Sequence, residues 1–397
     1  MIYKECIVSA ADEIKNSVID WKVISPENDN CFFGYYDLNA YDRTGKKHLC
    51  CRTSFIDRIP GEEDVLELGF VENKKFYKFA QTTAWNFQQG AMLQYVGGLD
   101  EKVCYNTRRQ NGFTTVLHNL KTGEKKDFEM AVACISPDGR YGLAINFSRI
   151  FDFRKGYGYN GIADRFMDQC RPKDDGIFLI DFLSGNIRFL ISYEDIYRNF
   201  PSDVTKNEKL VVNHITFNTT SNRFLFLLRN FPGRNEKEWG TTLITSDLNG
   251  NMRMVLENRF ISHYAWKNEN QILAFCAPQE QAGLFLINEE DGSFSQLKSP
   301  YPNGPFDGDI HCIYSPDRRF ILGDGYPDNE GYRPLFLYDL KTENITRLLR
   351  AKSTLDDNWD IRCDLHARFN RSGDKISFDS SHNGRRQICE IELNSIL

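Results

Sequence analysis

The stretch CISPDGRYGLAINF, residues 134–147, decides the fold because its pattern recurs along the chain. It predicts a strand, a tight turn formed by Pro-Asp-Gly, and a second strand. Four later stretches repeat the pattern, namely ITFNTTSNRFLFLL (215–228), YAWKNENQILAFC (264–276), CIYSPDRRFILGD (312–324) and ARFNRSGDKISFD (367–379). Repetition at intervals of about 50 residues is typical of an array of similar supersecondary units.

Each hairpin is followed by a second pair of predicted strands, at 176–191, 242–256, 283–297, 335–349 and 386–393. Two weaker units precede them, at 32–53 with 65–80 and at 92–106 with 113–128. Four strands per unit and seven units predict an all-β fold, a seven-bladed β-propeller with four-stranded antiparallel blades over residues 1–397. Residues 1–30 form an N-terminal segment, in which VIDWKVI (18–24) is expected to close the ring against the last blade.

Composition limits the classes of function. The 397 residues contain 49 Lys and Arg against 55 Asp and Glu, and a net charge of −6 excludes a generally basic nucleic-acid binder. No apolar run reaches about 18 residues, so no membrane span is expected. The N-terminus lacks the pattern of a signal peptide, and the 11 cysteines include no CxxC pair, which predicts a cytoplasmic protein. Helix signals are few, and YEDIYRNF (193–200) is one of them.

Four of the seven histidines occupy one position of the repeat, three residues before an aromatic residue: His214, His263, His311 and His366. The innermost strands of a propeller line its central channel, so these imidazoles are expected to converge near the axis. Converging imidazoles suit a divalent metal such as Mn or Zn. Asp364, on the same strand face as His366, is a further ligand or orients one. The alternative is a polar channel in which the histidines bind water and backbone.

The long connections between second and third strands are expected on the histidine side of the ring. They carry Arg108, Arg109, Arg149, Arg154, Arg229, Arg234, Arg333, Tyr157, Tyr159, Tyr326 and His382. Arginine binds carboxylate or sulfate with two parallel hydrogen bonds, so these loops indicate an anionic, ring-bearing ligand. Arg368 shares a strand face with His366 and is expected to point into the channel.

The first two blades offer other polar and aromatic groups. Trp85, Gln88 and Gln89 lie just before or within an inner strand, where they either contact a sugar or pack in the core. Tyr35, Tyr36 and Asp37 are interpreted as core packing at the first inner strand, and His48 and His118 as structural.

Several segments resemble a known family. ISPDGR, YSPDRRF and NRSGDKISF are similar to the TolB-type propeller repeat. From His214 onward the chain resembles the oligogalacturonate lyases and the seven-bladed ulvan lyases, through HITFN, HYAW, HCIYSPD with GDGYPD, and DLHARFNRSGDKISFDSSHNGRRQI. The resemblance implies a metal held by His263, His311 and His366, with Asp364 at a further ligand position. Where ulvan-type lyases use histidine and tyrosine, this chain has Gln88, Gln89 and Asn106.

This resemblance predicts a carbon–oxygen lyase that cleaves an acidic, uronate-containing oligosaccharide or polysaccharide by β-elimination, with a divalent metal and no organic cofactor. Neutralising the carboxylate is assigned to the metal with Arg149 or Arg229, and proton transfer to Tyr159 or His382. Substrate binding is assigned to Trp85, Gln88, Gln89, Asn106, Arg368 and Tyr326. Two alternatives stay open. One is a non-catalytic glycan-binding or assembly propeller with a structural metal, and the other is a glycoside hydrolase using Asp324, Asp328 or Asp379.

Overall fold

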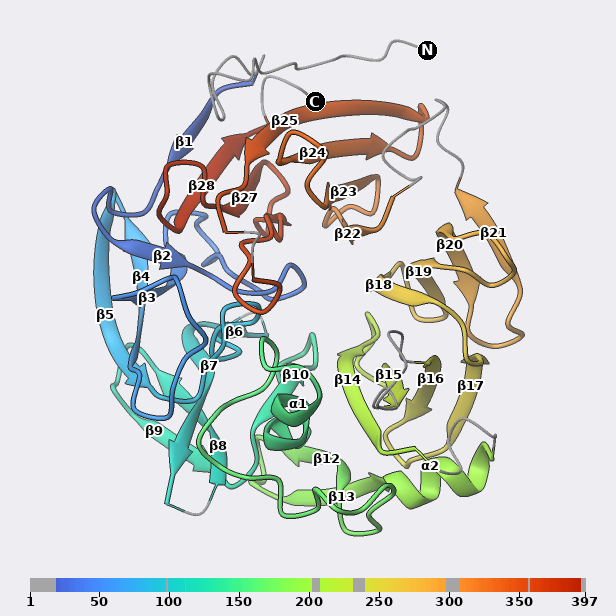
Figure 1. Cartoon of the computed structure of the whole chain (residues 1–397). Coiled ribbons are helices and arrows are strands. Elements are labelled where there is room, and N and C mark those ends of the chain that lie inside the picture. Colours follow the sequence, from blue (N-terminus) through green and yellow to red (C-terminus); the bar gives the residue numbers. More distant parts are fainter. Residues whose placement is uncertain are drawn as a thin grey trace.

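Seven four-stranded antiparallel sheets stand around one axis in the computed structural model (Figure 1). The structure describes residues 19–97, 99–110, 112–201, 208–230, 240–297, 308–355 and 358–393. The predicted fold class is therefore confirmed, and the seven repeat units are the seven blades. Arg234 and residues 1–18 lie outside the described residues.

In the first six blades the strands follow one another from the hub to the rim. Blade 1 contains β2 (Asn30–Phe32), β3 (His48–Thr53), β4 (Leu66–Glu72) and β5 (Lys75–Thr82). Blade 2 contains β6 (Gln94–Val96), β7 (Leu99–Arg109), β8 (Gly112–Asn119) and β9 (Lys125–Phe128). Blade 3 contains β10 (Val132–Ile135), β11 (Tyr141–Ala144), β12 (Gly176–Asp181) and β13 (Ile187–Ser192).

The next blades repeat this order. Blade 4 contains β14 (Leu210–Phe217), β15 (Arg223–Asn230), β16 (Thr241–Asp247) and β17 (Met252–Leu256). Blade 5 contains β18 (Ile261–Trp266), β19 (Gln271–Cys276), β20 (Gly283–Asn288) and β21 (Phe294–Leu297). Blade 6 contains β22 (Ile310–Tyr314), β23 (Phe320–Gly325), β24 (Tyr332–Asp339) and β25 (Asn344–Lys352).

The seventh blade is built from both ends of the described chain. Its order is β26 (Arg368–Phe369), β27 (Lys375–Ser380), β28 (Gln387–Glu392) and then β1 (Trp21–Val23) at the rim. Figure 1 shows the blue β1 beside the red β28, and Lys22 pairs in register with Glu390. The ammonium of Lys22 also lies 2.6 Å from Glu392. The N-terminal strand thus closes the ring within the segment expected to do so.

The blades pack face to face through apolar strands. In β15 every residue after Arg223 is buried, because both faces of the strand contact neighbouring blades. Leu225 and Leu227 of this strand pack with Tyr264 and Trp266 of the next blade. This contact between adjacent blades fixes where the inner strands point at the hub.

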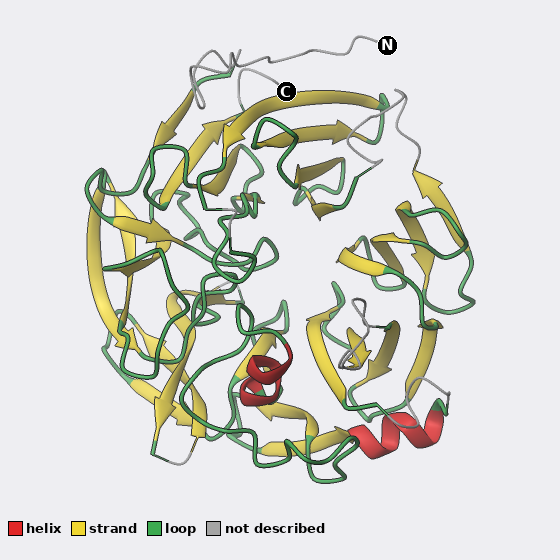
Figure 2. Ribbon diagram, viewed as in Figure 1, coloured by secondary structure: helices red, strands yellow, loops and turns green. Residues whose placement is uncertain are grey.

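In the described part of the chain two helices interrupt the repeat (Figure 2). The helix α2 (Tyr193–Asn199) confirms the prediction from YEDIYRNF, and a capping box between Ser192 and Asp195 starts it. The helix α1 (Phe147–Phe153) lies in one of the long connections between second and third strands, the segment 146–176 of blade 3. The side chain of Asn146 accepts a hydrogen bond from the backbone N–H of Arg149 and caps this helix.

Candidate active site at the hub

β-Bulges turn two of the histidines out of their strands. Asn213 pairs with Leu227 and Ile215 with Phe226, so His214 is an extra residue without a partner in the ladder. Its φ of 50° lies in the left-handed region, which a residue other than glycine enters at an energetic cost. The pairing of β18 also shifts between Ile261 and Tyr264, around His263. Bulges re-aim side chains in this way beside functional sites.

Three imidazoles are oriented through Nδ1. Nδ1 of His263 lies 2.9 Å from Oδ1 of Asp309. Nδ1 of His311 lies 3.0 Å from Oδ2 of Asp324, and Nδ1 of His366 lies 3.0 Å from the carbonyl oxygen of Gly34. A carboxylate or carbonyl oxygen only accepts, so Nδ1 carries the proton in each ring. The lone pair therefore resides on Nε2, the atom that a histidine with an oriented Nδ1 offers to a metal.

His311, Asp364 and His366 form a group that suits a metal ion. One ligand atom from each lies within 4.8 Å of the others, and all three residues are buried. The Nε2 atoms of His311 and His366 have no hydrogen-bond partner among the described residues. Buried polar atoms are seldom left without partners, so these two nitrogens fit a group that is bound there. Two imidazoles and a carboxylate are ligands that Mn²⁺ and Zn²⁺ both accept.

Asp364 is shared between this group and two arginines. Its Oδ1 lies 2.7 Å from Nη1 of Arg333, and its Oδ2 lies 2.8 Å from Nη2 of Arg362. Burial acts to raise the pKa of Asp364, but the two guanidinium charges outweigh it and hold the pKa well below the usual value. The carboxylate is therefore ionised, and its surroundings are positively charged.

Tyr35 and Tyr36 are buried in the core, as the core-packing interpretation expects, and they also contact the histidines at the hub. The ring of Tyr35 stacks on His214 at 5.2 Å and contacts His366 edge-on at 4.8 Å. His214 thus contacts Tyr35 and lies outside the group formed by His311, Asp364 and His366. Gly34 allows this inward path, because a Cβ at its φ of 141° would lie 3.0 Å from the carbonyl oxygen of Gln89.

The segment 146–176, between β11 and β12 of blade 3, contacts the connection between blades 6 and 7. The backbone N–H of Gly156 donates to Oδ1 of Asp360 at 2.9 Å, and Nη2 of Arg362 donates to the hydroxyl of Tyr157 at 3.2 Å. These contacts join residues more than 200 positions apart in the sequence. The segment therefore forms one wall of the site.

A pocket of about 680 Å³ opens beside the histidines. Its lining residues are Arg154, His214, Arg229, Gly240, Thr241, Asn258, Arg259, Phe260, Ile261, Ser262, His263, Asp309, Tyr326 and Trp359. They come from blades 4, 5 and 6, from the connection between blades 6 and 7, and from the segment after α1. The lining contains three arginines and one carboxylate, Asp309, which is hydrogen-bonded to His263 and Ser262. This balance favours an anionic ligand.

Two of the residues predicted for catalysis or substrate binding, Arg229 and Tyr326, line this pocket. Burial, with the charge of Arg154 nearby, lowers the pKa of Arg229 to about 10, so its guanidinium is still charged at neutral pH. The ring of Tyr326 lies 6.3 Å from that of His263. Burial lowers the pKa of His263 below its usual value, although Asp309 opposes the shift. His263 is therefore a neutral imidazole whose Nδ1 is held by a carboxylate.

The other residues predicted for catalysis or substrate binding lie outside this pocket lining. Arg149 is fully buried and donates to Asp164 and to the carbonyl oxygens of Leu210, Phe166, Gln169 and Cys170. Tyr159 stacks on Phe147 and accepts from Asn106. His382 is hydrogen-bonded to Ser380, and the indole N–H of Trp85 donates to the backbone carbonyl of Asp64. The side chain of Gln88 donates to the backbone carbonyl of Arg362. Arg368 donates to the backbone carbonyl of His366 and forms an ion pair with Asp379. Gln89 lines a small cavity beside Tyr35 and His214.

Sequence reasoning also missed Asp309, although a signal was present. Asp309 stands two residues before His311, as Asp364 stands two residues before His366. The Asp-x-His pattern is repeated in consecutive blades and marks both carboxylates, although only Asp364 is among the predicted ligands. In the folded protein Asp309 binds the histidine of the preceding blade, a pairing that spacing within one strand does not reveal.

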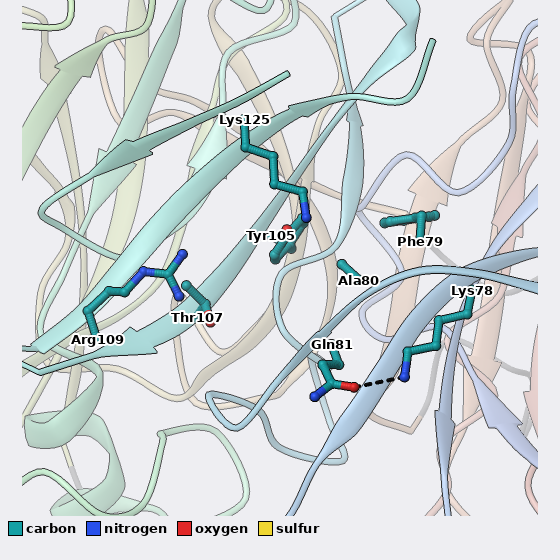
Figure 3. A pocket seen from close by; sticks show the side chains of 8 residues that line it. All are labelled: Lys78, Phe79, Ala80, Gln81, Tyr105, Thr107, Arg109 and Lys125. Carbon is teal, nitrogen blue, oxygen red and sulfur yellow. Dashed lines mark hydrogen bonds between the residues drawn. The ribbon is translucent and has the colours of Figure 1, made fainter. Parts of the chain in front are cut away.

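A second cavity of about 510 Å³ lies between the outer parts of blades 1 and 2 (Figure 3). It is lined by Lys78, Phe79, Ala80, Gln81, Tyr105, Thr107, Arg109 and Lys125. Nζ of Lys78 lies 2.9 Å from Glu67, and Nη2 of Arg109 lies 2.8 Å from Asp127. The lining has no histidine or carboxylate, and it lacks the cluster of imidazoles and carboxylates that the hub provides.

Comparison with protein-family models and with curated protein sequences found no match. Among solved structures, an oligogalacturonate lyase in complex with manganese is 12% identical, with a TM-score of 0.67 over 96% of this chain and 94% of that chain. The chain shares the fold of the oligogalacturonate lyases. A second one, from Vibrio parahaemolyticus, is 12% identical with a TM-score of 0.64 over 97% of this chain and 96% of that chain.

The same propeller architecture serves other proteins. The tricorn protease is 13% identical with a TM-score of 0.50, and the match covers 94% of this chain and 34% of that chain. Fold therefore does not decide the chemistry, which has to come from the site. Among the described residues, no helix has the length and apolar character needed to cross a membrane.

Proposed function

We propose that the protein is a metal-dependent lyase that cleaves acidic, uronate-containing oligosaccharides by β-elimination. The observation that carries the proposal is the arrangement around His263. Its Nδ1 is held by Asp309, it lines a pocket with three arginines, and its ring lies 4.1 Å from that of His311 in the metal-binding group. A base, cationic groups and metal ligands thus meet in one place.

His311, Asp364 and His366 are the residues that would hold the metal. A divalent cation bound there supplies Lewis-acid neutralisation of a carboxylate, which acidifies the adjacent C–H. Arg333 and Arg362 already surround Asp364, so the loaded site would carry excess positive charge that an anionic substrate offsets. Mn²⁺ and Zn²⁺ both suit this donor set, and Mn²⁺ accompanies the lyase of the same fold.

The side chains around the pocket perform the remaining steps. Arg229 and Arg154 bind the uronate carboxylate and orient the ring. Nε2 of His263 takes the C5 proton, and Asp309 stabilises the imidazolium that forms. The electron pair of the C–H bond forms the C4–C5 double bond, the C4–O bond breaks, and the leaving oxygen takes a proton from water in the open pocket. Tyr326 offers a hydroxyl to the substrate.

The hydrolase alternative needs two free carboxylates across the pocket. Asp324 is bonded to His311 and to the backbone of Ala367, Asp379 is paired with Arg368, and Asp328 is paired with Arg350. None of these three lines the pocket that His263 faces. The described lining residues therefore favour elimination over hydrolysis.

The test is incubation of the Mn²⁺-loaded protein with trigalacturonate. Elimination is expected to generate the ultraviolet absorbance of an unsaturated uronate. New reducing ends without that absorbance would establish hydrolysis, and binding without either product would establish a glycan-binding propeller. The control protein is Lys125→Ala, in the groove between blades 1 and 2, which is expected to behave as the wild type.

A further inference from the structure

Two aromatic side chains that line the pocket, Trp359 and Phe260, are largely exposed. Trp359 is 53% exposed and Phe260 is 52% exposed, the two largest exposures among the aromatic side chains of the described chain. Trp359 lies in the connection from β25 to β26, and Phe260 in the connection from β17 to β18. Around the ring, His263, Asp309 and Tyr326 stand between them. Exposed apolar groups that gather on a groove mark a binding surface.

The indole of Trp359 is held in a fixed orientation. It stacks on Tyr326 with 9° between the ring planes and 5.6 Å between centroids. The guanidinium of Arg362 lies 4.2 Å from the indole centroid, and its Nη1 donates to the backbone carbonyl of Trp359 at 2.7 Å. A ring positioned on several sides loses little conformational entropy when a ligand packs against it.

Phe260 is positioned by its backbone and by one aromatic contact. Its carbonyl accepts from the N–H of Ala277 at 2.8 Å, and the N–H of Arg259 donates to the Thr241 carbonyl at 2.9 Å. The phenyl ring meets Phe275 edge-on at 6.1 Å. The same backbone path places Arg259 in the pocket lining, so a cation and an exposed ring are adjacent there.

We infer that Trp359 and Phe260 are stacking platforms for the sugar rings that flank the reacting uronate, one on each side of His263. The site thereby selects a chain of several acidic sugars over a single one. A pyranose ring offers a face of C–H groups that packs on an aromatic ring, while its carboxylate reaches arginine. This inference rests on the proposed function for the identity of the reacting ring, but not for the stacking itself.

The experiment measures binding by calorimetry with galacturonate and trigalacturonate, using Trp359→Ala and Phe260→Ala. Each variant is expected to bind trigalacturonate about tenfold more weakly and galacturonate as the wild type does. Trp359→Phe is expected to retain most of the affinity. Phe294→Ala is the matched control, because Phe294 is 40% exposed and meets Phe285 edge-on at 5.8 Å, away from the pocket.

Unchanged trigalacturonate affinity in both alanine variants would overturn the inference. So would equal losses for galacturonate and trigalacturonate, or an equal loss in Phe294→Ala. Because binding is measured rather than turnover, the two proposals fail separately. A protein that binds trigalacturonate through Trp359 but forms no unsaturated product contradicts only the lyase function.

Discussion

Nδ1 of His263 lies 2.9 Å from Oδ1 of Asp309, and this contact joins the inner strand of one blade to the residue that precedes the inner strand of the next. The carboxylate fixes the tautomer and the plane of the ring, as a buried carboxylate does for a catalytic histidine. It leaves Nε2 as the basic atom at the pocket wall. The group that suits a metal ion, in contrast, comprises His311, Asp364 and His366 without His263.

We predict that His263→Gln lowers kcat by about 10²- to 10⁴-fold while the bound metal is retained, because the variant removes the base alone. Asp309→Asn should lower kcat by a smaller factor, since the ring keeps Nε2 but loses its anionic partner. Product formation and elemental analysis of the same samples check both points. Loss of metal together with activity in His263→Gln would make His263 a ligand, as the family resemblance implies.

Metal binding is expected to fail in His311→Ala and in His366→Ala. The wild type should hold about one Mn²⁺ per chain, and added Mn²⁺ should raise its melting temperature by mass action. Neither variant should show that rise. His118→Gln serves as the control, because His118 lies in blade 2 and contacts Phe79. Equal metal content in all four proteins would show that His311 and His366 are not ligands and would favour the alternative, a polar channel in which they bind water and backbone.

Arg229→Gln is expected to raise the KM for an acidic oligosaccharide by about tenfold, because the variant lacks the buried guanidinium that is proposed to bind the uronate carboxylate of the substrate. The melting temperature should change little. Raising the salt concentration should weaken binding to the wild type more than to the variant, since part of the attraction is electrostatic. A KM that is unchanged in Arg229→Gln would remove this residue from the binding role.

The repeat in the sequence predicted the blades because each strand pair carries its own turn and its own alternation of apolar residues. The segments ISPDGR and YSPDRRF each contain the residues of one such turn. Aligning the repeats then shows that the histidines share one position. Contacts between blades are different. Asp309 binds the histidine of the blade before it, and Tyr35 reaches His214 across the hub. No pattern within one repeat predicts these contacts between side chains of different blades.

The bulge at His214 and the helix α1 escaped prediction for a related reason. A positive φ at a histidine is unfavourable by itself and exists only because the surrounding blade holds it. The helix has only seven residues, Phe147–Phe153, and its burial depends on packing against β14 of blade 4. The sequence also could not show that Arg149 would be turned inward, away from the pocket.

Arg149→Met tests whether Arg149 serves the fold or the chemistry. Its guanidinium lies 3.1 Å from Asp164, and both side chains are fully buried. Removing the guanidinium takes the nearest cation from buried Asp164 and leaves the carbonyl oxygens of Gln169 and Cys170 without its hydrogen bonds, so the variant is expected to lose about 3–5 kcal/mol of unfolding free energy. Its kcat at a temperature where it stays folded should match the wild type. A large loss of kcat with unchanged stability would support the catalytic assignment made from the sequence.

His48 should make stability depend on pH. Its Nδ1 lies 2.6 Å from the Leu49 carbonyl oxygen and its Nε2 lies 2.9 Å from Oγ of Ser377. Burial, assisted by the charge of Arg368, lowers its pKa from 6.5 to about 3. Between these values the unfolded chain binds a proton that the folded chain does not, so stability falls as the pH falls below 6.5. At pH 5 the titration of this group alone should lower the unfolding free energy by about 2 kcal/mol.

Chemical denaturation of the wild type and of His48→Gln isolates the effect of His48, because the contributions of other groups cancel in the difference between the two unfolding free energies. That difference should be constant above pH 7.5 and should shrink by about 2 kcal/mol at pH 5. A difference that is the same at both pH values would show that His48 titrates normally in the folded protein.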